Sequence, residues 1–381
     1  MKSYDFVVGG GSVAGLSFAA EASRRGASVL VAEAHAEIGE PEKCDGLVSL
    51  RGLRRWGYEP KKQVIQDTIT SAVIHSPANH RFAVDASKLE VVVIDRSQYD
   101  KQLWETALQN GAEVRTGVRV ASLTESEDGS IVRLDDEDVR AAYYVDSTGP
   151  SSSPRRGILP AAKYEVEGDW VQQHVVEVFM DAERFPGFFA WVIPYGGRLA
   201  KVGAAGHGIN PFRALDSFLD GRSCSIIRKV SAPIYVGGPV SRFVEGRKML
   251  VGESAGQVKP TTAGGITTSV AAGVLAAKWG CTALGDSGPE VINGYQEEWE
   301  AAFMKEMKTM LRLRGILEKL TNSDLEALIR AIASPGLVSK LSQTDFDFHA
   351  SSLLGLLGVK GALKIAKVVA SAEVRSLIVE A

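Results

Sequence analysis

The sequence has few cysteines and no long apolar run, and each shortage excludes a class of protein. Three cysteines, Cys44, Cys224 and Cys281, are spread over 381 residues without a CxxC pair. A disulfide framework and a metal site are therefore not expected, and the composition fits a reducing compartment. No stretch reaches the roughly 18–20 apolar residues of a membrane-spanning helix. Because MKSYDFVV enters a predicted strand at once, we expect no secretion signal and a cytoplasmic location.

Positive charge is not in excess either. Lysine and arginine number 43 against 46 aspartates and glutamates, a formal net charge of −3. No basic cluster stands out, so a nucleic-acid partner is not expected. The length exceeds what a single hydrophobic core usually holds, which predicts two intertwined domains.

The first residues carry the pattern of a dinucleotide-binding βαβ unit. An apolar run, DFVV, is followed by GGGSVAG, a helical pattern, and a second apolar run that ends at Glu33. The fingerprint falls on Gly10, Ser12 and Gly15, with Ser12 where a second glycine usually stands. Such a turn holds a pyrophosphate at a helix N-terminus, and the acid after the second strand binds an unphosphorylated ribose, which favours FAD or NAD over NADP. A plain tight turn is the alternative for the glycines alone.

Three later segments also predict contacts to a cofactor. IDRSQYD places Arg96 at the start of a helix, where a surface arginine that caps the helix is the alternative. AAYYVDSTG ends a strand in Ser147-Thr148-Gly149, and VGESAGQVKPTTAGGI surrounds the carboxylate of Glu253 with small residues. Glycine-rich backbone can approach a flat or anionic group closely, so these segments predict further contacts to the same cofactor.

In this order the segments resemble the FAD-dependent reductases and monooxygenases of the para-hydroxybenzoate hydroxylase type, and among them the geranylgeranyl reductase family. The resemblance covers about residues 1–310. Its more discriminating motifs are IGEPEKCDGLVS (Ile38–Ser49), YEVEG (Tyr164–Gly168), PGFFAWVIP (Pro186–Pro194) and VGESAGQVKPTTAGGI (Val251–Ile266).

The resemblance implies an α/β fold in which a Rossmann-type FAD-binding domain is interleaved with a β-sheet substrate domain, followed by a helical C-terminal region. The implied ranges are residues 1–75, 92–160 and 245–290 for the FAD-binding domain, 76–91 and 161–244 for the substrate domain, and 291–381 for the helical region.

The resemblance also implies site residues. The implied FAD contacts are Gly10, Ser12, Ala14 and Gly15 at the pyrophosphate, Glu33 at the ribose, Cys44, Asp45 and Leu47 in the loop after the second strand, Arg96, Val120 near the adenine, and Gly252, Glu253, Gly265 and Ile266 closing the site. The implied substrate contacts are Phe189, Trp191 and Pro194. Cys44 is the candidate catalytic residue, and a small buried hydrophobe is its alternative.

Two departures from the family pattern affect this interpretation. The family has aspartate where Glu253 stands, and tyrosine where Phe189 stands. The second change removes a tyrosine-based acid from the mechanism. Phe189 and Trp191 share one face of the expected strand, so they line either a cavity for a long apolar ligand or the core of a sheet.

The function that the resemblance implies is FAD-dependent saturation of C=C double bonds in geranylgeranyl or other prenyl chains, in membrane ether-lipid biosynthesis. The implied partners are a prenyl-chain lipid or an isoprenoid diphosphate as substrate, and NAD(P)H or a reduced redox protein as external electron donor. Two alternatives stay open. FAWVIP resembles the WxWxIP pattern of flavin-dependent halogenases, which suggests a monooxygenase or halogenase acting on an apolar or aromatic substrate. A lipid-binding protein with an inert flavin fold is the non-enzymatic alternative.

The C-terminal third is predicted to be helical. Its last segment, SSLLGLLGVKGALKIAKVVASAEV, places Lys360, Lys364 and Lys367 on one helical face opposite apolar residues. An amphipathic helix with peripheral membrane contact and a helix packed on its own domain both fit this pattern.

Overall fold

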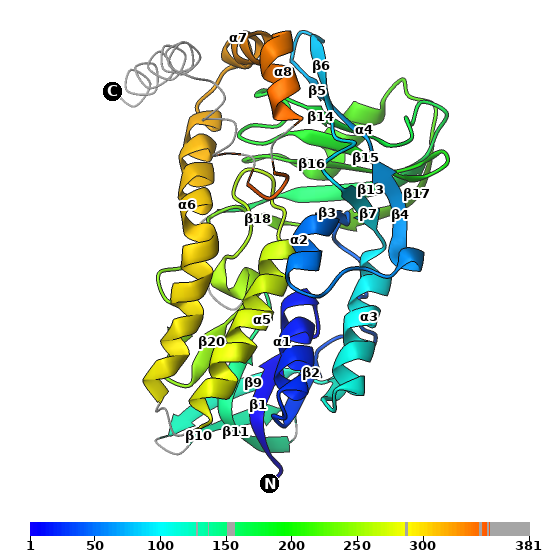
Figure 1. Ribbon diagram of the computed structural model, residues 1–381. Coiled ribbons are helices and arrows are strands. Elements are labelled where there is room, and N and C mark those ends of the chain that lie inside the picture. Colours follow the sequence, from blue (N-terminus) through cyan, green and yellow to red (C-terminus); the bar gives the residue numbers. More distant parts are fainter. Residues whose placement is uncertain are drawn as a thin grey trace.

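The chain folds into an elongated molecule with one sheet-containing half at each end of Figure 1. The computed structural model describes residues 1–126, 129–135, 137–150, 157–285, 289–342, 345–348 and 350. The long helix α6 (Gly294–Leu317) runs along one side and spans both halves. The predicted α/β fold class is confirmed, and the ranges of the two domains stay predictions.

Eight strands within the described residues form the lower sheet, and its centre is parallel. Their order is β19 (Val244–Glu245), β20 (Lys248–Leu250), β11 (Glu137–Asp146), β1 (Ser3–Gly9), β2 (Val29–Glu33) and β8 (Glu113–Thr116), with β10 (Gly129–Leu134) and β9 (Val120–Ser126) continuing from β11. In β1, Phe6 and Val8 face the core with the helices, and Val7 faces a second core with β10 and β11. Cover on both faces explains why β1 is a continuous apolar run.

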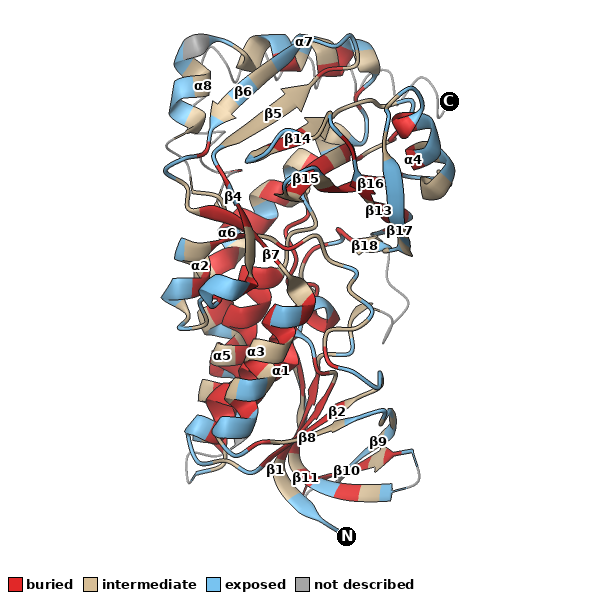
Figure 2. Ribbon diagram, turned by 90° about the vertical axis from the view of Figure 1, so that its right-hand side faces the viewer, coloured by how far each residue is buried: buried red, intermediate tan, exposed pale blue. Residues whose placement is uncertain are grey.

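Three helices pack beside this sheet and carry the predicted cofactor segments. They are α1 (Val13–Arg24), α3 (Arg96–Gln109) and α5 (Ile266–Ala283). In Figure 2, α1 and α5 show mostly buried residues. A Cβ on Gly273 of α5 would lie 2.5 Å from the Ala14 carbonyl oxygen of α1, so the two helices cross in close contact there.

Seven strands of the described chain form the upper sheet. Their order is β17 (Ser225–Ser231), β13 (Ala161–Glu167), β16 (Leu199–Ala205), β15 (Ala190–Gly196), β14 (Val175–Phe179), β5 (Ser71–His75) and β6 (Arg81–Asp85). Because β5 pairs with β14 and β6, residues 71–75 lie in this sheet and not with the FAD-binding segments to which the predicted boundary assigned them.

The two faces of the upper sheet differ in chemistry. Tyr164, Val192 and Val202 pack against the helix α4 (Pro211–Leu219). Residues of the opposite parity, Lys163 and Lys201 among them, are bonded to the loop that follows β2. A three-stranded sheet of β3 (Leu47–Ser49), β7 (Val91–Ile94) and β4 (Ile65–Ile69), with the short helix α2 (Leu50–Arg55), lies between the halves.

The C-terminal helices complete the fold. Trp299 and Phe303 of α6 share the core of the lower half, and α7 (Asn322–Ile332) and α8 (Pro335–Leu341) lie at the upper end in Figure 1. Residues 345–348 approach the start of α5. Within the described residues, no helix combines the length and hydropathy required to cross a bilayer. The predicted basic helix around Lys360 lies outside the described residues.

Candidate functional site

The glycine turn between β1 and α1 is as tight as the sequence predicts. Gly10 has φ +100, and a Cβ there would lie 2.6 Å from the Ser147 carbonyl oxygen. A Cβ on Gly15 would lie 2.1 Å from the Gly10 carbonyl oxygen. Ser12 is exposed at the N-cap of α1 and its side chain makes no capping bond, so the first N–H groups of the helix are left for another acceptor.

Glu33 lies beside this turn. Its carboxylate accepts a hydrogen bond from the Gly11 N–H at 2.7 Å and contacts the His35 backbone N–H and Nδ1 at 2.8 and 2.7 Å. The Val118 N–H donates to the Glu33 carbonyl at 2.9 Å, which holds the start of β9, with Val120, near the end of β2. The two residues predicted to contact the adenosine part of the cofactor therefore lie in neighbouring segments.

The strand-end segment Ser147–Gly149 and the loop around Glu253 are bonded to each other and to the glycine turn. The Ser147 hydroxyl contacts the Gly9 and Gly10 carbonyls at 2.8 and 2.7 Å. The Gly149 N–H donates to Ser254 Oγ at 2.9 Å, and the Gly252 N–H donates to the Gln257 side chain at 2.8 Å. Segments far apart in sequence thus converge on the start of α1.

Glu253 lies in the loop whose Ser254 side chain is bonded to Gly149. Its side chain is exposed to solvent, yet the surrounding protein raises the pKa of its carboxyl by desolvation, against the opposing effect of Arg96 and Lys43. A group that is both accessible and surrounded by protein can reach a bound molecule without a large rearrangement.

We expect Glu253→Ala to weaken FAD binding roughly tenfold or more, because a hydrogen bond to a charged group contributes about 1.5–3 kcal/mol. Glu253→Asp should keep FAD bound. The measurement is a fluorescence titration of the apoprotein with FAD. Glu105→Ala is the control, because Glu105 is an exposed glutamate of α3 that pairs with Lys61. An alanine variant with wild-type affinity contradicts the role of Glu253.

The side chain of Arg96 is largely buried, which argues against the alternative of a surface arginine that caps the helix. Asp95 is the N-cap of α3, and the Arg96 side chain is 11% exposed and 2.8 Å from Asp100. Burial alone would lower the pKa of Arg96, but Asp100 and the Cys44 thiol more than offset it and the pKa is raised. The Arg96 Nε is buried without a hydrogen-bond partner among the described residues, so it offers a donor to a bound group.

A recess at the start of α5 brings together three of the predicted flavin contacts. Leu47, Gly265 and Ile266 line a space of about 210 Å³, part of it open to solvent. Gly265, the N-cap of α5, has no side chain that could accept a hydrogen bond from the first N–H groups of this helix, so these groups are available to negative charge.

The sequence did not predict the part that residues 345–348 play at this recess. Phe346 and Asp347 line it, and Asp347 pairs with Lys259 at 3.1 Å. Lys259 in the KPTTAGG stretch could have indicated a buried acidic partner, but the sequence could not identify Asp347, which is 88 residues away.

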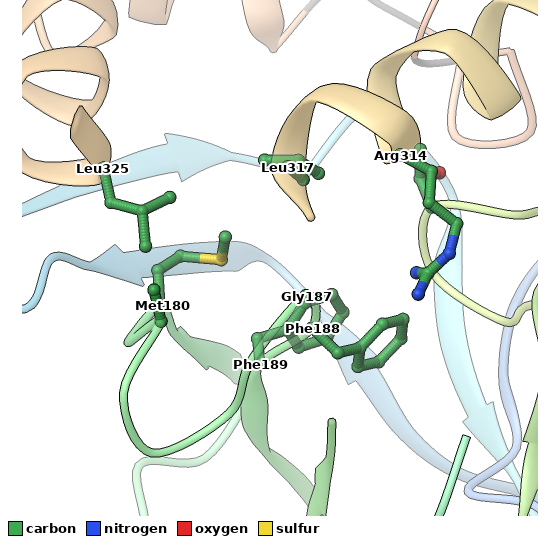
Figure 3. Close-up of a pocket in the computed structure, with 9 residues that line it drawn as sticks. Met180, Gly187, Phe188, Phe189, Arg314, Leu317 and Leu325 are labelled. Carbon is green, nitrogen blue, oxygen red and sulfur yellow. The ribbon is translucent and has the colours of Figure 1, made fainter. Parts of the chain in front are cut away.

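The predicted substrate residues divide between two places. Phe189 lines a recess of about 320 Å³ that is partly open to solvent (Figure 3). Phe188 stacks on Phe189 at 4.1 Å, and Arg314 and Leu317 of α6 lie across from them. Trp191 instead donates from Nε1 to the Asp45 carboxylate at 2.8 Å. Pro194 is buried in β15 and does not line this recess.

A buried group of charges joins the cofactor loop to the upper sheet, and sequence reasoning missed it. We define this inter-sheet charge cluster by six residues: Glu42, Asp45, Lys163, Glu165, Lys201 and Arg228. The two lysines are each 1% exposed. Lys201 Nζ lies 3.0 Å from Glu42 Oε1, and Lys163 Nζ donates to the Cys44 carbonyl at 2.9 Å. The signal was a lysine inside each of the apolar strands AAKYEVE and LAKVGAA.

Comparison with known proteins identifies similar sequences. The family described as FAD binding domain matches residues 4–206. Digeranylgeranylglycerophospholipid reductase 2 of Methanopyrus kandleri is 32% identical over 363 residues, which cover 86% of this chain and 90% of the relative. Digeranylgeranylglycerophospholipid reductase 1 of the same organism is 30% identical, covering 90% of this chain and 97% of the relative.

Solved structures share the fold. A geranylgeranyl bacteriochlorophyll reductase-like protein from Thermoplasma acidophilum superposes with a TM-score of 0.87 at 22% identity, over 98% of this chain and 99% of that one. The halogenase PltM superposes with a TM-score of 0.70 at 15% identity, over 97% of this chain and 85% of that one. At these identities the two structures show that this chain shares their fold, and nothing more. FAD is the cofactor that the matched family binds.

Proposed function

This chain belongs to the family of the digeranylgeranylglycerophospholipid reductases, and from that premise we propose that it uses FAD to saturate C=C double bonds in the geranylgeranyl chains of an ether-lipid precursor. The observation that carries the proposal is the hydrogen bond of 2.8 Å between Trp191 and Asp45. It joins the strand of predicted substrate residues to the loop of predicted cofactor residues, so the two predicted sites are in direct contact there.

The residues of the lower half fit FAD. The Gly10–Gly15 turn would receive the pyrophosphate on the N–H groups of α1, and Glu33 would bind the adenosine ribose. The unpartnered Nε of Arg96 and the uncapped start of α5 supply donors for further polar groups of the cofactor. FAD, when bound and reduced, supplies the hydride that one alkene carbon accepts.

The upper half would bind and orient the prenyl chain. Phe188 and Phe189, with Met180, Leu317 and Leu325, provide an apolar wall for it. Burial of a hydrocarbon chain contributes about 25 cal/mol per Å² of apolar surface and excludes water from the reacting carbons. Cys44 lies beside Arg96, in the loop that follows Glu42 and precedes β3, where it would touch the cofactor or the chain.

The partners follow from the same proposal. The proposed reaction requires a prenyl lipid as substrate and a source of electrons for the flavin. Whether the head group is a phospholipid or a diphosphate, and whether NAD(P)H or a reduced redox protein is the donor, stay predictions. The sequence relatives named above are reductases, whereas the halogenase is a likeness of fold at 15% identity. The reductase is therefore favoured over the halogenase or monooxygenase alternative.

The experiment incubates dithionite-reduced protein anaerobically with digeranylgeranylglycerophospholipid and measures the lipid by mass spectrometry. We expect masses that rise in steps of two hydrogens. Protein without FAD is the control, since it should leave the lipid unchanged. An unchanged lipid with the holoprotein, or a hydroxylated or halogenated product when oxygen and halide are supplied, contradicts the proposal.

A further inference from the structure

We infer that Asp45 is the acid of the reaction and that its Oδ1 delivers the proton to the second alkene carbon. The inference rests on the proposed function, because an isolated double bond accepts a hydride only when a proton arrives at the other carbon. Phe189, which lines the predicted substrate recess, offers no hydroxyl for this purpose.

The two oxygens of the Asp45 carboxyl have different surroundings. Oδ2 accepts a hydrogen bond from Trp191 Nε1 at 2.8 Å. The Trp191 ring lies flat against β16 because Gly203 has no side chain there, and a Cβ on Gly203 would be 2.1 Å from the ring. Oδ1 is buried and has no hydrogen-bond partner among the described residues. With a donor fixed on Oδ2, Oδ1 is the oxygen on which a proton fits.

The charged neighbours of Asp45 leave this proton in place. Lys163 Nζ forms an ion pair with Oδ1 at 3.9 Å, which is too long for a hydrogen bond, and it donates its hydrogen bond to the Cys44 carbonyl at 2.9 Å. Lys201 Nζ is 3.0 Å from Glu42 and 3.3 Å from the Asp45 carbonyl. Burial raises the pKa of the Asp45 carboxyl, Glu42 adds to the rise, and Lys163, Lys201 and Trp191 oppose it. The neutral acid is therefore favoured above the ordinary pKa range of aspartate.

The proposed step balances. FAD, when bound and reduced, would supply the hydride, with its two electrons, to one alkene carbon, while the Asp45 O–H bond breaks and its proton forms the C–H bond at the other carbon. Asp45 is left as a carboxylate, which the Trp191 N–H and Lys163 stabilise. It then regains a proton from solvent before the next turnover.

The test compares wild-type holoprotein with Asp45→Asn, which keeps an oxygen for Trp191. Infrared spectroscopy at neutral pH should show the band of a protonated carboxyl that is absent from the variant. Oxidation of the reduced flavin by the lipid should slow about 100-fold or more, the usual range for a general acid. Both proteins are compared at saturating FAD and after complete reduction by dithionite, so that only the step with the lipid is measured. Asp85→Asn, at an exposed position of β6, is the matched control and should behave as wild type.

The pH dependence separates an acid from a structural role. The wild-type rate should fall as the pH rises through the raised pKa of Asp45, because the proton is then lost, and Asp45→Asn should lack this limb of the profile. If the wild type reduces the lipid and Asp45→Asn has the same rate and the same pH profile, the inference about Asp45 is overturned and the proposed function is not. An infrared carboxyl band that is unchanged in the variant has the same consequence. A larger loss in Cys44→Ala than in Asp45→Asn assigns the proton to Cys44 and also overturns it. A wild type that leaves the lipid unreduced contradicts the proposed function first.

Discussion

Gly15→Ala is expected to leave the purified protein without bound FAD. The added methyl would lie 2.1 Å from the Gly10 carbonyl oxygen and 2.4 Å from Ser147 Oγ. Gly10 is part of the turn itself, and the Ser147 hydroxyl is bonded to the Gly9 and Gly10 carbonyls, so relief of the clash has to move the backbone that receives the pyrophosphate. Overpacking of this kind typically costs about 1–3 kcal/mol, and an equal loss in binding weakens the affinity for FAD by roughly tenfold or more.

The measurement is the flavin absorbance of the purified variant, followed by titration of the apoprotein with FAD. Gly315→Ala is the matched control, because Gly315 is also helical and a Cβ there would meet nothing within 4 Å. A Gly15→Ala protein that retains stoichiometric FAD shows that α1 does not hold the pyrophosphate.

Lys201→Met is expected to destabilise the protein by about 3–5 kcal/mol, the usual cost of removing one partner of a buried ion pair. Lys201 is 1% exposed and its Nζ contacts Glu42, the Asp45 carbonyl and Gln66. Without it, the Glu42 carboxylate loses its nearest cation. Urea denaturation measures the change. Lys61→Ala, which removes an exposed pair with Glu105, should cost about 0–1 kcal/mol. Equal costs for the two variants would contradict the prediction.

The same cluster sets an acid limit to stability. Burial would raise the pKa of Glu42, but Lys201 and Lys163 more than offset it, so the pKa lies below its ordinary value. Glu42 therefore stabilises the fold at a pH above its unfolded pKa, and this contribution is lost as the pH falls through the folded pKa. In Lys201→Met the loss should begin at a higher pH, because burial then acts with less opposition.

The local parts of the site could be predicted because each depends on a short stretch. The turn at Gly10 and Gly15, the acid at Glu33 and the loop around Glu253 follow from glycine geometry and the ends of predicted strands. The fold class and the FAD cofactor, which the family resemblance implied, were predicted correctly. The predicted residues at the glycine turn and in the Glu253 loop occupy segments that converge in the structure, and the individual roles of all the site residues stay predictions.

Contacts between distant segments could not be predicted. Lys201 meets Glu42 across 159 residues, and Lys163 meets the Cys44 carbonyl across 119. A lysine in an apolar strand indicates a buried partner but does not identify it. The pairing of β5 with β14 also depends on the tertiary fold, and sequence reasoning did not predict that residues 71–75 join the upper sheet.

The measurement that tests the central claim most directly is an anaerobic single turnover of the reduced holoprotein with digeranylgeranylglycerophospholipid. Flavin absorbance and lipid mass are followed in the same sample. The account predicts that each flavin reoxidised corresponds to one double bond saturated. Reduced flavin that persists beside unchanged lipid, and is reoxidised only when oxygen is admitted, would contradict it.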